Sequence, residues 1–153
     1  MLDRDSAAPP MSSPRPVVAR TYKYQAQMGP LASCPPSTAK EGDRSCFRFV
    51  GSPLKASHFL PIPLEDPDRS LSGEQSCAGW GLSLFDTDAA ARKRYAELTK
   101  RHKTLKKKWT HLAKLDLTPD HGAHTASNSI GHFTLFEYAN ADLTTCATTV
   151  GTL

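Results

Sequence analysis

Three short runs of the chain carry the aromatic and aliphatic pattern of β-strands. They are residues 45–50, 82–85 and 132–138, each rich in Phe, Leu, Val or Tyr. Gly51, Ser52 and Pro53 close the first run, and a Gly-Trp-Gly sequence at 79–81 introduces the second. Such turn residues commonly bound a strand, so we predict a strand at each of the three runs.

Residues 87–117 fit two different patterns. In a single helix of about 27 residues, apolar or aromatic positions recur at spacings of four and three and form one seam. Such a rod would be about 40 Å long, which is large for so small a domain. In the second interpretation a helix covers about 87–103, Lys106–Lys108 form a loop, and a strand covers about 108–117. We favour the second interpretation, with Asp86, Thr87 and Asp88 as candidate helix caps.

Proline divides the rest of the chain. Residues 1–44 contain seven of the twelve prolines, so we predict a flexible, disordered Pro/Ser-rich tail there. Residues 45–145 are predicted to form one compact α+β domain, with a small mixed or antiparallel sheet and one main basic helix. Within it, residues 53–75 contain Pro61, Pro63 and Pro67 and are expected to form a long ordered loop. Residues 146–153 are expected to be a Thr-rich C-terminal tail.

Targeting signals and cysteine spacing suggest a compartment. The N-terminal stretch has no apolar core of the length that a secretory signal needs, and no segment approaches the roughly 20 apolar residues of a membrane span. The expected location is therefore the cytoplasm. The four cysteines lack the short spacings of a zinc or redox motif, so they are expected to be free thiols.

Positive charge is concentrated in one segment. Residues 87–117 hold ten Lys or Arg and three Asp or Glu, a net charge of +7, whereas the whole chain carries +4. This density indicates either a solvated helix face or a surface for an anionic partner. The patch is predicted to include Arg92, Arg94, Lys100, Arg101, Lys106, Lys107 and Lys108. One functional hypothesis is therefore a basic interaction module that binds nucleic acid or an acidic protein such as an antitoxin.

A second hypothesis rests on three motifs in a fixed order. The first is residues 46–49 (CFRF), on the first predicted strand. The second is residues 81–87 (GLSLFDT), a glycine-preceded strand that leads through a Thr into the helix with Ala91 and the pair Tyr95-Ala96. The third is Glu137, the only carboxylate on the last predicted strand. Together they resemble the ADP-ribosyltransferase-like superfamily of bacterial toxins and effectors.

The resemblance implies a role for each matched residue. Arg48 would contact NAD, Ser83 and Tyr95 would belong to the nicotinamide pocket, and Glu137 would be the catalytic carboxylate. A guanidinium suits a diphosphate, and a carboxylate can stabilise the positive ribose that remains when nicotinamide leaves. Each residue also has a structural interpretation as an exposed strand position or a satisfied hydroxyl. The chain is therefore expected to be an NAD-using transferase or a non-catalytic relative.

Histidines provide one further candidate site. His121, His124 and His132 have spacings compatible with metal ligation, together with Asp120. The first two lie in a glycine-containing loop without a supporting carboxylate, so no metal site is expected.

Overall fold

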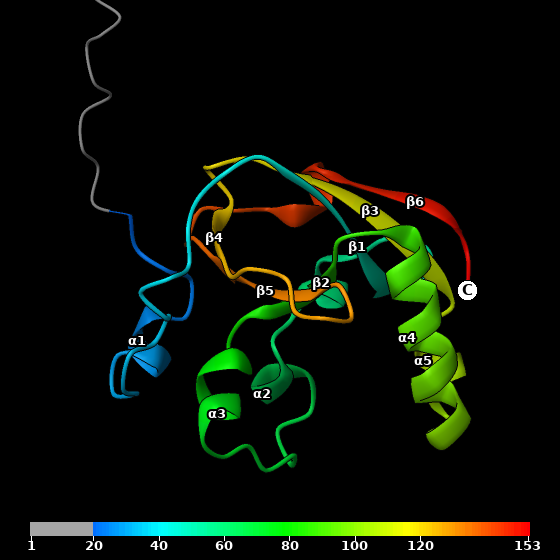
Figure 1. Ribbon diagram of the computed structural model, residues 1–153, viewed down its shortest axis with the longest axis horizontal. Coiled ribbons are helices and arrows are strands. Elements are labelled where there is room, and N and C mark those ends of the chain that lie inside the picture. Colours follow the sequence, from blue (N-terminus) through cyan, green and yellow to red (C-terminus); the bar gives the residue numbers. More distant parts are fainter. Residues whose placement is uncertain (1–19) are drawn as a thin grey trace, which may run out of the picture.

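The computed structural model describes residues 20–153, so the part of the predicted disordered tail at residues 1–19 lies outside it. The described chain forms a six-stranded sheet with helices around it, and the predicted α+β class is confirmed (Figure 1). The strands are β1 (Arg44–Val50), β2 (Leu82–Phe85), β3 (His111–Leu117), β4 (Gly122–His124), β5 (His132–Glu137) and β6 (Ala147–Thr152). The α-helices are α1 (Gln25–Met28), α2 (Ile62–Glu65), α3 (Glu74–Ala78), α4 (Asp88–Arg101) and α5 (Leu105–Lys108), and the 3₁₀-helices are η2 (Ala56–Phe59) and η3 (Leu143–Thr145).

The sheet is weakly joined at its centre. Its order is β4-β5-β2-β1-β3-β6, and every neighbouring pair is antiparallel. β1 pairs with β3 along its whole length, but it shares with β2 only the register pair Phe47↔Phe85. The sheet therefore consists of two three-stranded halves with a short joint between β1 and β2.

Each face of the sheet has its own core, because alternate strand residues point to opposite faces. One core combines apolar residues of β1, β2, β3 and β5 with Phe59 of η2 and Leu143 of η3. The other lies under α4 and includes Phe49, Phe85 and Ala91. In Figure 1, α4 and α5 lie together at the right, whereas α2 and α3 lie together at the bottom. We call the two faces the η-face and the α4-face.

Helix α4 ends where the favoured interpretation of residues 87–117 predicted. Its N-cap is Thr87, whose hydroxyl accepts a hydrogen bond from the Ala90 N–H at 3.0 Å. The helix stops after Arg101, and the strand β3 begins ten residues later, so a helix and a strand are confirmed and the single rod is wrong. The loop expected at Lys106–Lys108 is wrong in detail, because Leu105–Lys108 form the single helical turn α5.

Three other expectations differ from the structure. Residues 20–43, assigned to the tail, contain α1 and are attached to the domain by isolated bridges, Tyr22↔Tyr138 and Lys40↔His124. The Thr-rich C-terminal stretch forms the edge strand β6, because its alternating residues pair with β3. Residues 53–75 also contain short helices instead of a continuous loop. Among the described residues, no helix is long and apolar enough to cross a membrane.

Two of the four cysteines, which were all expected to be free thiols, are paired. Cys34 and Cys77 form a disulfide across a sequence separation of 43, whereas Cys46 and Cys146 are free. Spacing along the sequence did not reveal this pair because the two residues meet only through the fold. The bond attaches the N-terminal segment to α3, which immediately precedes β2.

Candidate functional site

A buried ion pair lies at the end of β5. Glu137 is the last residue of the strand, and its side chain is only 2% exposed. Its Oε2 lies 2.8 Å from Nζ of Lys23, which also donates a hydrogen bond to the Ala141 carbonyl. The other carboxylate oxygen, Oε1, is buried and is the one buried side-chain polar atom without a hydrogen-bond partner among residues 20–153.

The environment of Glu137 raises the pKa of its carboxyl above the ordinary value. Burial raises the pKa of the Glu137 carboxyl, while the Lys23 hydrogen bond and charge and the more distant Arg48 charge act to lower it. Buried polar atoms in folded proteins are nearly always hydrogen-bonded, so an unpartnered oxygen is unusual. Oε1 is therefore available to a ligand, either as an acceptor or, when protonated, as a donor.

Arg48 lies at the joint between the two halves of the sheet. Its Nη1 donates to the Ser83 carbonyl of β2 at 2.9 Å, and its Nε donates to the His58 carbonyl of η2 at 2.9 Å. The guanidinium thus bridges β1 and β2 where their ladder stops. No carboxylate of the described residues forms an ion pair with Arg48, although Glu65 and Glu137 are near enough to influence its pKa, which burial lowers.

The sheet brings Arg48 and Glu137 to the same face. Arg48 alternates with Cys46 and Val50 on β1, and Glu137 alternates with Phe133 and Leu135 on β5. All four of these neighbours belong to the η-face core. The side chains of Arg48 and Glu137 therefore also lie on that face of the sheet. We call Lys23, Arg48 and Glu137 the Glu137 site.

Ser83 and Tyr95 lie on the opposite side. Ser83 stands between Leu82 and Leu84, which point into the η-face core, so its hydroxyl is on the exposed α4-face. Tyr95 packs on Phe49, and its hydroxyl donates to the Trp109 carbonyl at 2.7 Å. The structure therefore brings Ser83 to Arg48 only through its backbone and does not bring Tyr95 to Glu137.

A small cavity opens beside Glu137. It has a volume of about 150 Å³, and its lining includes Lys23, Tyr24, Phe59, Glu137 and Asp142. This volume suits one ring or sugar and is below the roughly 300–1,000 Å³ of pockets that hold a whole drug-sized ligand. Access to Glu137 on this side is limited by the segment that carries Lys23.

Lys23 was not among the residues predicted from the sequence. It lies in the run Tyr22-Lys23-Tyr24, within the proline-rich stretch that was assigned to the tail. The segment is fixed to the end of β5, because the Lys23 N–H donates to the Glu137 carbonyl at 2.9 Å and the Tyr22 and Tyr138 rings lie 5.2 Å apart. The two tyrosines beside Lys23 were the sequence signal of an ordered segment, since Tyr22 forms an isolated bridge with Tyr138.

A second cluster of charges surrounds Arg44 at the start of β1. Arg44 Nη2 lies 2.7 Å from Asp86 Oδ1, and its guanidinium stacks over the Phe133 ring. Its Nη1 lies 3.0 Å from Nδ1 of His124, and Ser127 donates to Asp86. This network joins β1, β2 and the loop after β4, so it has a structural role.

The candidate metal-binding histidines do not converge. His124 contacts Arg44, His121 accepts a hydrogen bond from the Thr118 N–H, and the His132 ring packs against Phe85. Among the described residues no group of three His, Cys, Asp or Glu side chains is arranged to hold a metal ion.

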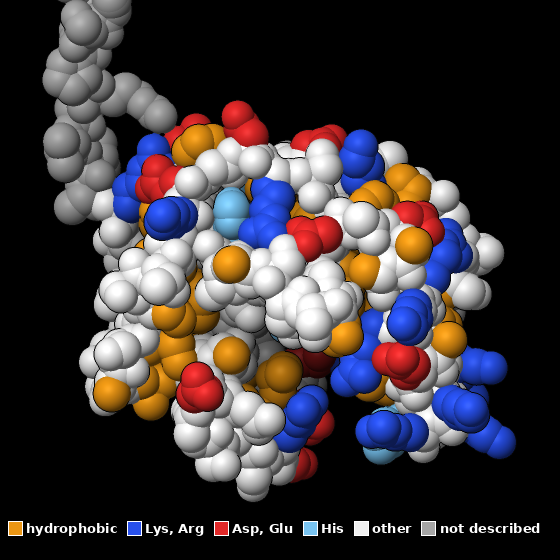
Figure 2. Space-filling model, viewed as in Figure 1, with side chains coloured by type: hydrophobic (Ala, Val, Ile, Leu, Met, Phe, Trp, Pro, Cys, Tyr) orange, Lys and Arg blue, Asp and Glu red, His pale blue; other side chains and the backbone are white. Residues whose placement is uncertain are grey.

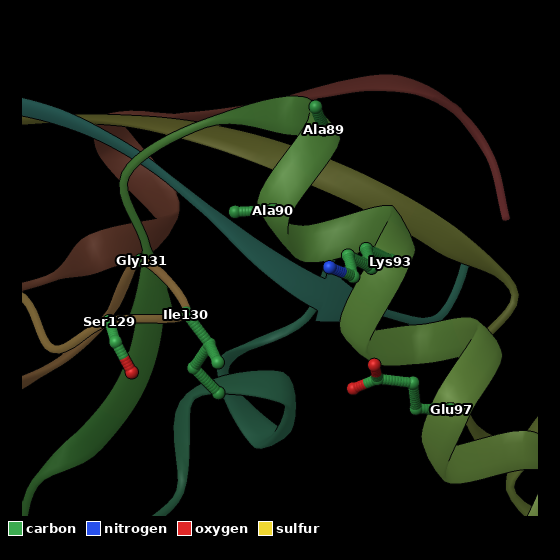
Figure 3. Close-up of a pocket in the computed structure, with 7 residues that line it drawn as sticks. All are labelled: Ala89, Ala90, Lys93, Glu97, Ser129, Ile130 and Gly131. Atoms are coloured by element: carbon green, nitrogen blue, oxygen red, sulfur yellow. The ribbon is translucent and has the colours of Figure 1, made fainter.

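Two larger cavities lie elsewhere. One, of about 350 Å³, separates α4 from the loop at Ser129–Gly131, and Lys93 and Glu97 project toward that loop (Figure 3). The other, of about 740 Å³, lies between the segment around Ser33 and helix α3, with Thr134 and Phe136 of β5 in its wall. Its lining is mostly apolar and contains one charged residue, Glu74, so it lacks the cations that a phosphate-bearing ligand requires.

The predicted basic patch is divided by its ion pairs. Arg92 contacts Asp88, Arg94 contacts Glu97, and Lys108 contacts Glu65. The other four predicted members, Lys100, Arg101, Lys106 and Lys107, are exposed and form no ion pair with the described residues. Lys103, between them in the sequence, has the same properties.

Comparison of the chain with protein-family models, with curated proteins and with solved structures gives no match.

Proposed function

We propose that this chain is an ADP-ribosyltransferase-like domain that uses NAD, with Glu137 as its catalytic carboxylate and Arg48 as its phosphate-binding residue. The observation that carries the proposal is the Glu137 carboxylate, which is buried at the end of β5 with one oxygen unpartnered. Burial of such a group is unfavourable unless it is satisfied, and perturbed carboxyls of this kind concentrate at functional sites.

The proposed chemistry uses the charge of Glu137. The bond between nicotinamide and ribose C1′ breaks, the electron pair leaves with nicotinamide, and positive charge develops on the ribose. A carboxylate in a desolvated site stabilises that charge far better than one in water. The nucleophile of an acceptor then bonds to C1′ and releases its proton, so the products are the ADP-ribosylated acceptor and nicotinamide.

Arg48 has donors left for a diphosphate. Its contacts with the His58 and Ser83 carbonyls use Nε and Nη1, and no hydrogen bond within the described residues uses Nη2. Arginine binds phosphate oxygens through parallel N–H donors and keeps its charge when half-buried. In this proposal Ser83 holds Arg48 through its backbone carbonyl, and Tyr95 supports α4 without contacting NAD.

The size of the cavity adds a requirement. A space of about 150 Å³ admits only one end of NAD, and Lys23 occupies the position next to the carboxylate. We therefore expect NAD to displace Lys23 and the segment around it. The disulfide between Cys34 and Cys77 restrains that segment, so its oxidation state is expected to influence NAD binding.

The test measures NAD binding and nicotinamide release separately. Calorimetry would give the affinity for NAD, and chromatography would give the rate of nicotinamide formation, each with and without a thiol reductant. Glu137→Gln is expected to lower turnover by at least about 100-fold while NAD still binds, because removal of a group that stabilises transition-state charge costs rates of this order. Glu97→Gln, an exposed carboxylate on α4, is the matched control.

Arg48→Lys separates binding from chemistry. It keeps the positive charge but loses the planar donors, so it is expected to weaken NAD binding. Absence of both binding and turnover at millimolar NAD, in the oxidised and reduced protein, would contradict the proposal. Binding without turnover would retain only a non-catalytic NAD-binding domain. A toxin or effector role would appear as growth arrest on expression that Glu137→Gln relieves.

A further inference from the structure

The C-terminal end of α4 and the turn α5 carry a group of exposed cations. We call Lys100, Arg101, Lys103, Lys106 and Lys107 the basic end; all five are exposed, and none forms an ion pair with a described residue. Lys and Arg side chains gather over α4 and α5 at the right of Figure 2. From Lys93 to Lys108 the sequence holds eight Lys or Arg and a single acidic residue, Glu97, which already pairs with Arg94.

Neighbouring charges do not neutralise this group. Glu65, the acidic residue that reaches α5, pairs with Lys108. Lys93, on the same helix, points toward the cavity beside the Ser129–Gly131 loop (Figure 3). Like charges three or four residues apart repel one another, and a bound polyanion would relieve that repulsion.

The surroundings favour phosphate over a protein partner. Protein–protein interfaces usually have an apolar core, rich in aromatic side chains and poor in charged ones, within a polar rim. The exposed large hydrophobic residues of the described chain are Leu64, Ile130 and Val150, and none belongs to α4 or α5. The apolar residues within this region, Leu105 and Trp109, are half-buried. A surface with many cations and without an apolar centre suits a backbone of regularly spaced phosphates.

We propose that the basic end binds the phosphate backbone of nucleic acid. The contacts would be electrostatic and independent of base sequence, because no exposed Phe, Tyr or Trp among the described residues of α4 and α5 accompanies the cations for stacking on bases. Double-stranded nucleic acid has the highest phosphate density and is the expected ligand. The surface is separate from Glu137, so this binding does not depend on NAD chemistry.

Salt dependence is the measurement that tests the proposal. Fluorescence anisotropy with a labelled 20-base-pair DNA, the same sequence as duplex RNA, and a single strand would be recorded between 50 and 200 mM salt. For five phosphate contacts on duplex DNA, the slope of log K against log salt is expected to be about −4.5, roughly a 500-fold loss of affinity over this range. Lys106→Gln with Lys107→Gln should reduce the slope to about −2.7 and the loss to roughly 40-fold.

The control removes the same charge elsewhere. Lys40→Gln with Lys114→Gln deletes two lysines outside α4 and α5, and the slope should stay within about 0.5 of the wild-type value. Glu137→Gln should bind nucleic acid like the wild type, so failure of the NAD proposal and failure of this one are distinguishable. Circular dichroism would confirm that the helices persist in each variant.

Four results would overturn the proposal. They are a flat salt response, equal loss of affinity in both lysine pairs, absence of binding to any nucleic acid at 50 mM salt, and binding to polyglutamate or anionic vesicles without binding to nucleic acid. A salt-dependent affinity that falls selectively in the Lys106 and Lys107 variant would confirm it.

Discussion

The Glu137 site and the basic end are both charged, but they differ in burial and in pairing. The Glu137 site has three charged residues from three distant parts of the sequence. Lys23 and Glu137 are held by their ion pair, and Arg48 is held by hydrogen bonds to backbone carbonyls. The basic end has five cations within eight residues of sequence, all exposed and none in an ion pair with the described chain. One region is assembled by the fold, and the other by local sequence.

This difference determines what each region can do. Charges in a desolvated site interact strongly, shift one another's pKa, and suit chemistry at a single atom. Exposed charges are screened by salt over about 10 Å, so they suit attraction of a large partner without a fixed geometry. Charge density along the sequence therefore points to a binding surface, whereas the candidate reactive group is a single buried carboxyl.

The largest expected effect concerns the disulfide that holds the N-terminal segment over Glu137. Cys34→Ser removes a cross-link between residues 43 apart, which is expected to lower the free energy of unfolding by about 4 kcal/mol on the chain-entropy account. Urea denaturation of the oxidised wild type and the variant would measure it. Cys146→Ser, which removes a free thiol, is the control. An equal midpoint for the wild type with and without reductant would show that the bond does not stabilise the fold.

The next effect comes from the ion pair itself. Lys23→Met leaves the buried Glu137 carboxylate without its cation, and loss of one partner of a buried pair is strongly destabilising. Since the Lys23 side chain is 30% exposed, we expect a reduced cost of about 2 kcal/mol at pH 7. Thermal and urea unfolding would measure it. Combining Lys23→Met with Glu137→Gln should restore most of the loss, because no uncompensated charge then remains.

The stability lost in Lys23→Met should depend on pH in a definite direction. The folded pKa of Glu137 is raised by burial, so the folded state keeps a proton that the unfolded state has lost, and stability falls as pH rises through that interval. Lys23→Met raises this pKa further. The loss of unfolding free energy caused by Lys23→Met should therefore have its full size above the raised pKa of Glu137. Below that pKa the loss should disappear. A deficit that is constant from pH 4 to 8 would contradict the electrostatic explanation.

Asp86 gives a smaller effect of opposite sign. Burial acts to raise its pKa, but the Ser127 and Arg44 hydrogen bonds and the Arg44 charge outweigh it, so the pKa is lowered. Asp86→Asn is expected to cost about 1 kcal/mol at pH 7, since its side chain is partly exposed. Here the stabilisation is present above the unfolded pKa and is lost as pH falls through the folded one. Unfolding curves of wild type and variant should converge in acid, and persistence of the gap at pH 2 would refute this account.

Local sequence was sufficient for the elements whose patterns lie within a few residues. The strands β1, β2, β3 and β5 and the Thr87-capped helix α4 follow from short apolar runs and cap residues. Strand β6 was missed because its threonines and glycine lack an apolar face, and it is ordered by pairing with β3. Helix α1 and the disulfide were missed because the many prolines of residues 1–44 led to the prediction of a disordered tail there.

The Glu137 site was predictable only in part, because some of its contacts form only when distant parts of the chain meet. Arg48 and Glu137 were identified on strands, and strand order places them on one face. Ser83 was expected beside them, but its neighbours Leu82 and Leu84 fill the η-face core, which turns the hydroxyl to the other face. Lys23 was not expected, since only the folded chain brings it to Glu137 across 114 residues. The sequence shows that residues of β2 alternate between two faces. It does not show which of these faces lies on the same side of the sheet as Arg48.

The smallest effect is expected at the basic end and gives the sharpest contrast with Lys23. Lys106→Gln with Lys107→Gln removes two exposed charges that have no ion-pair partner in the described chain, and Gln retains the helix propensity of Lys. Exposed charges of this kind contribute little, so the free energy of unfolding should change by less than about 0.5 kcal/mol, while nucleic-acid affinity falls. Reduced repulsion among the remaining cations favours a slight gain in stability at low salt. Urea unfolding at 20 and 500 mM salt would measure it, and a loss above about 1 kcal/mol would mean that these lysines also support the fold.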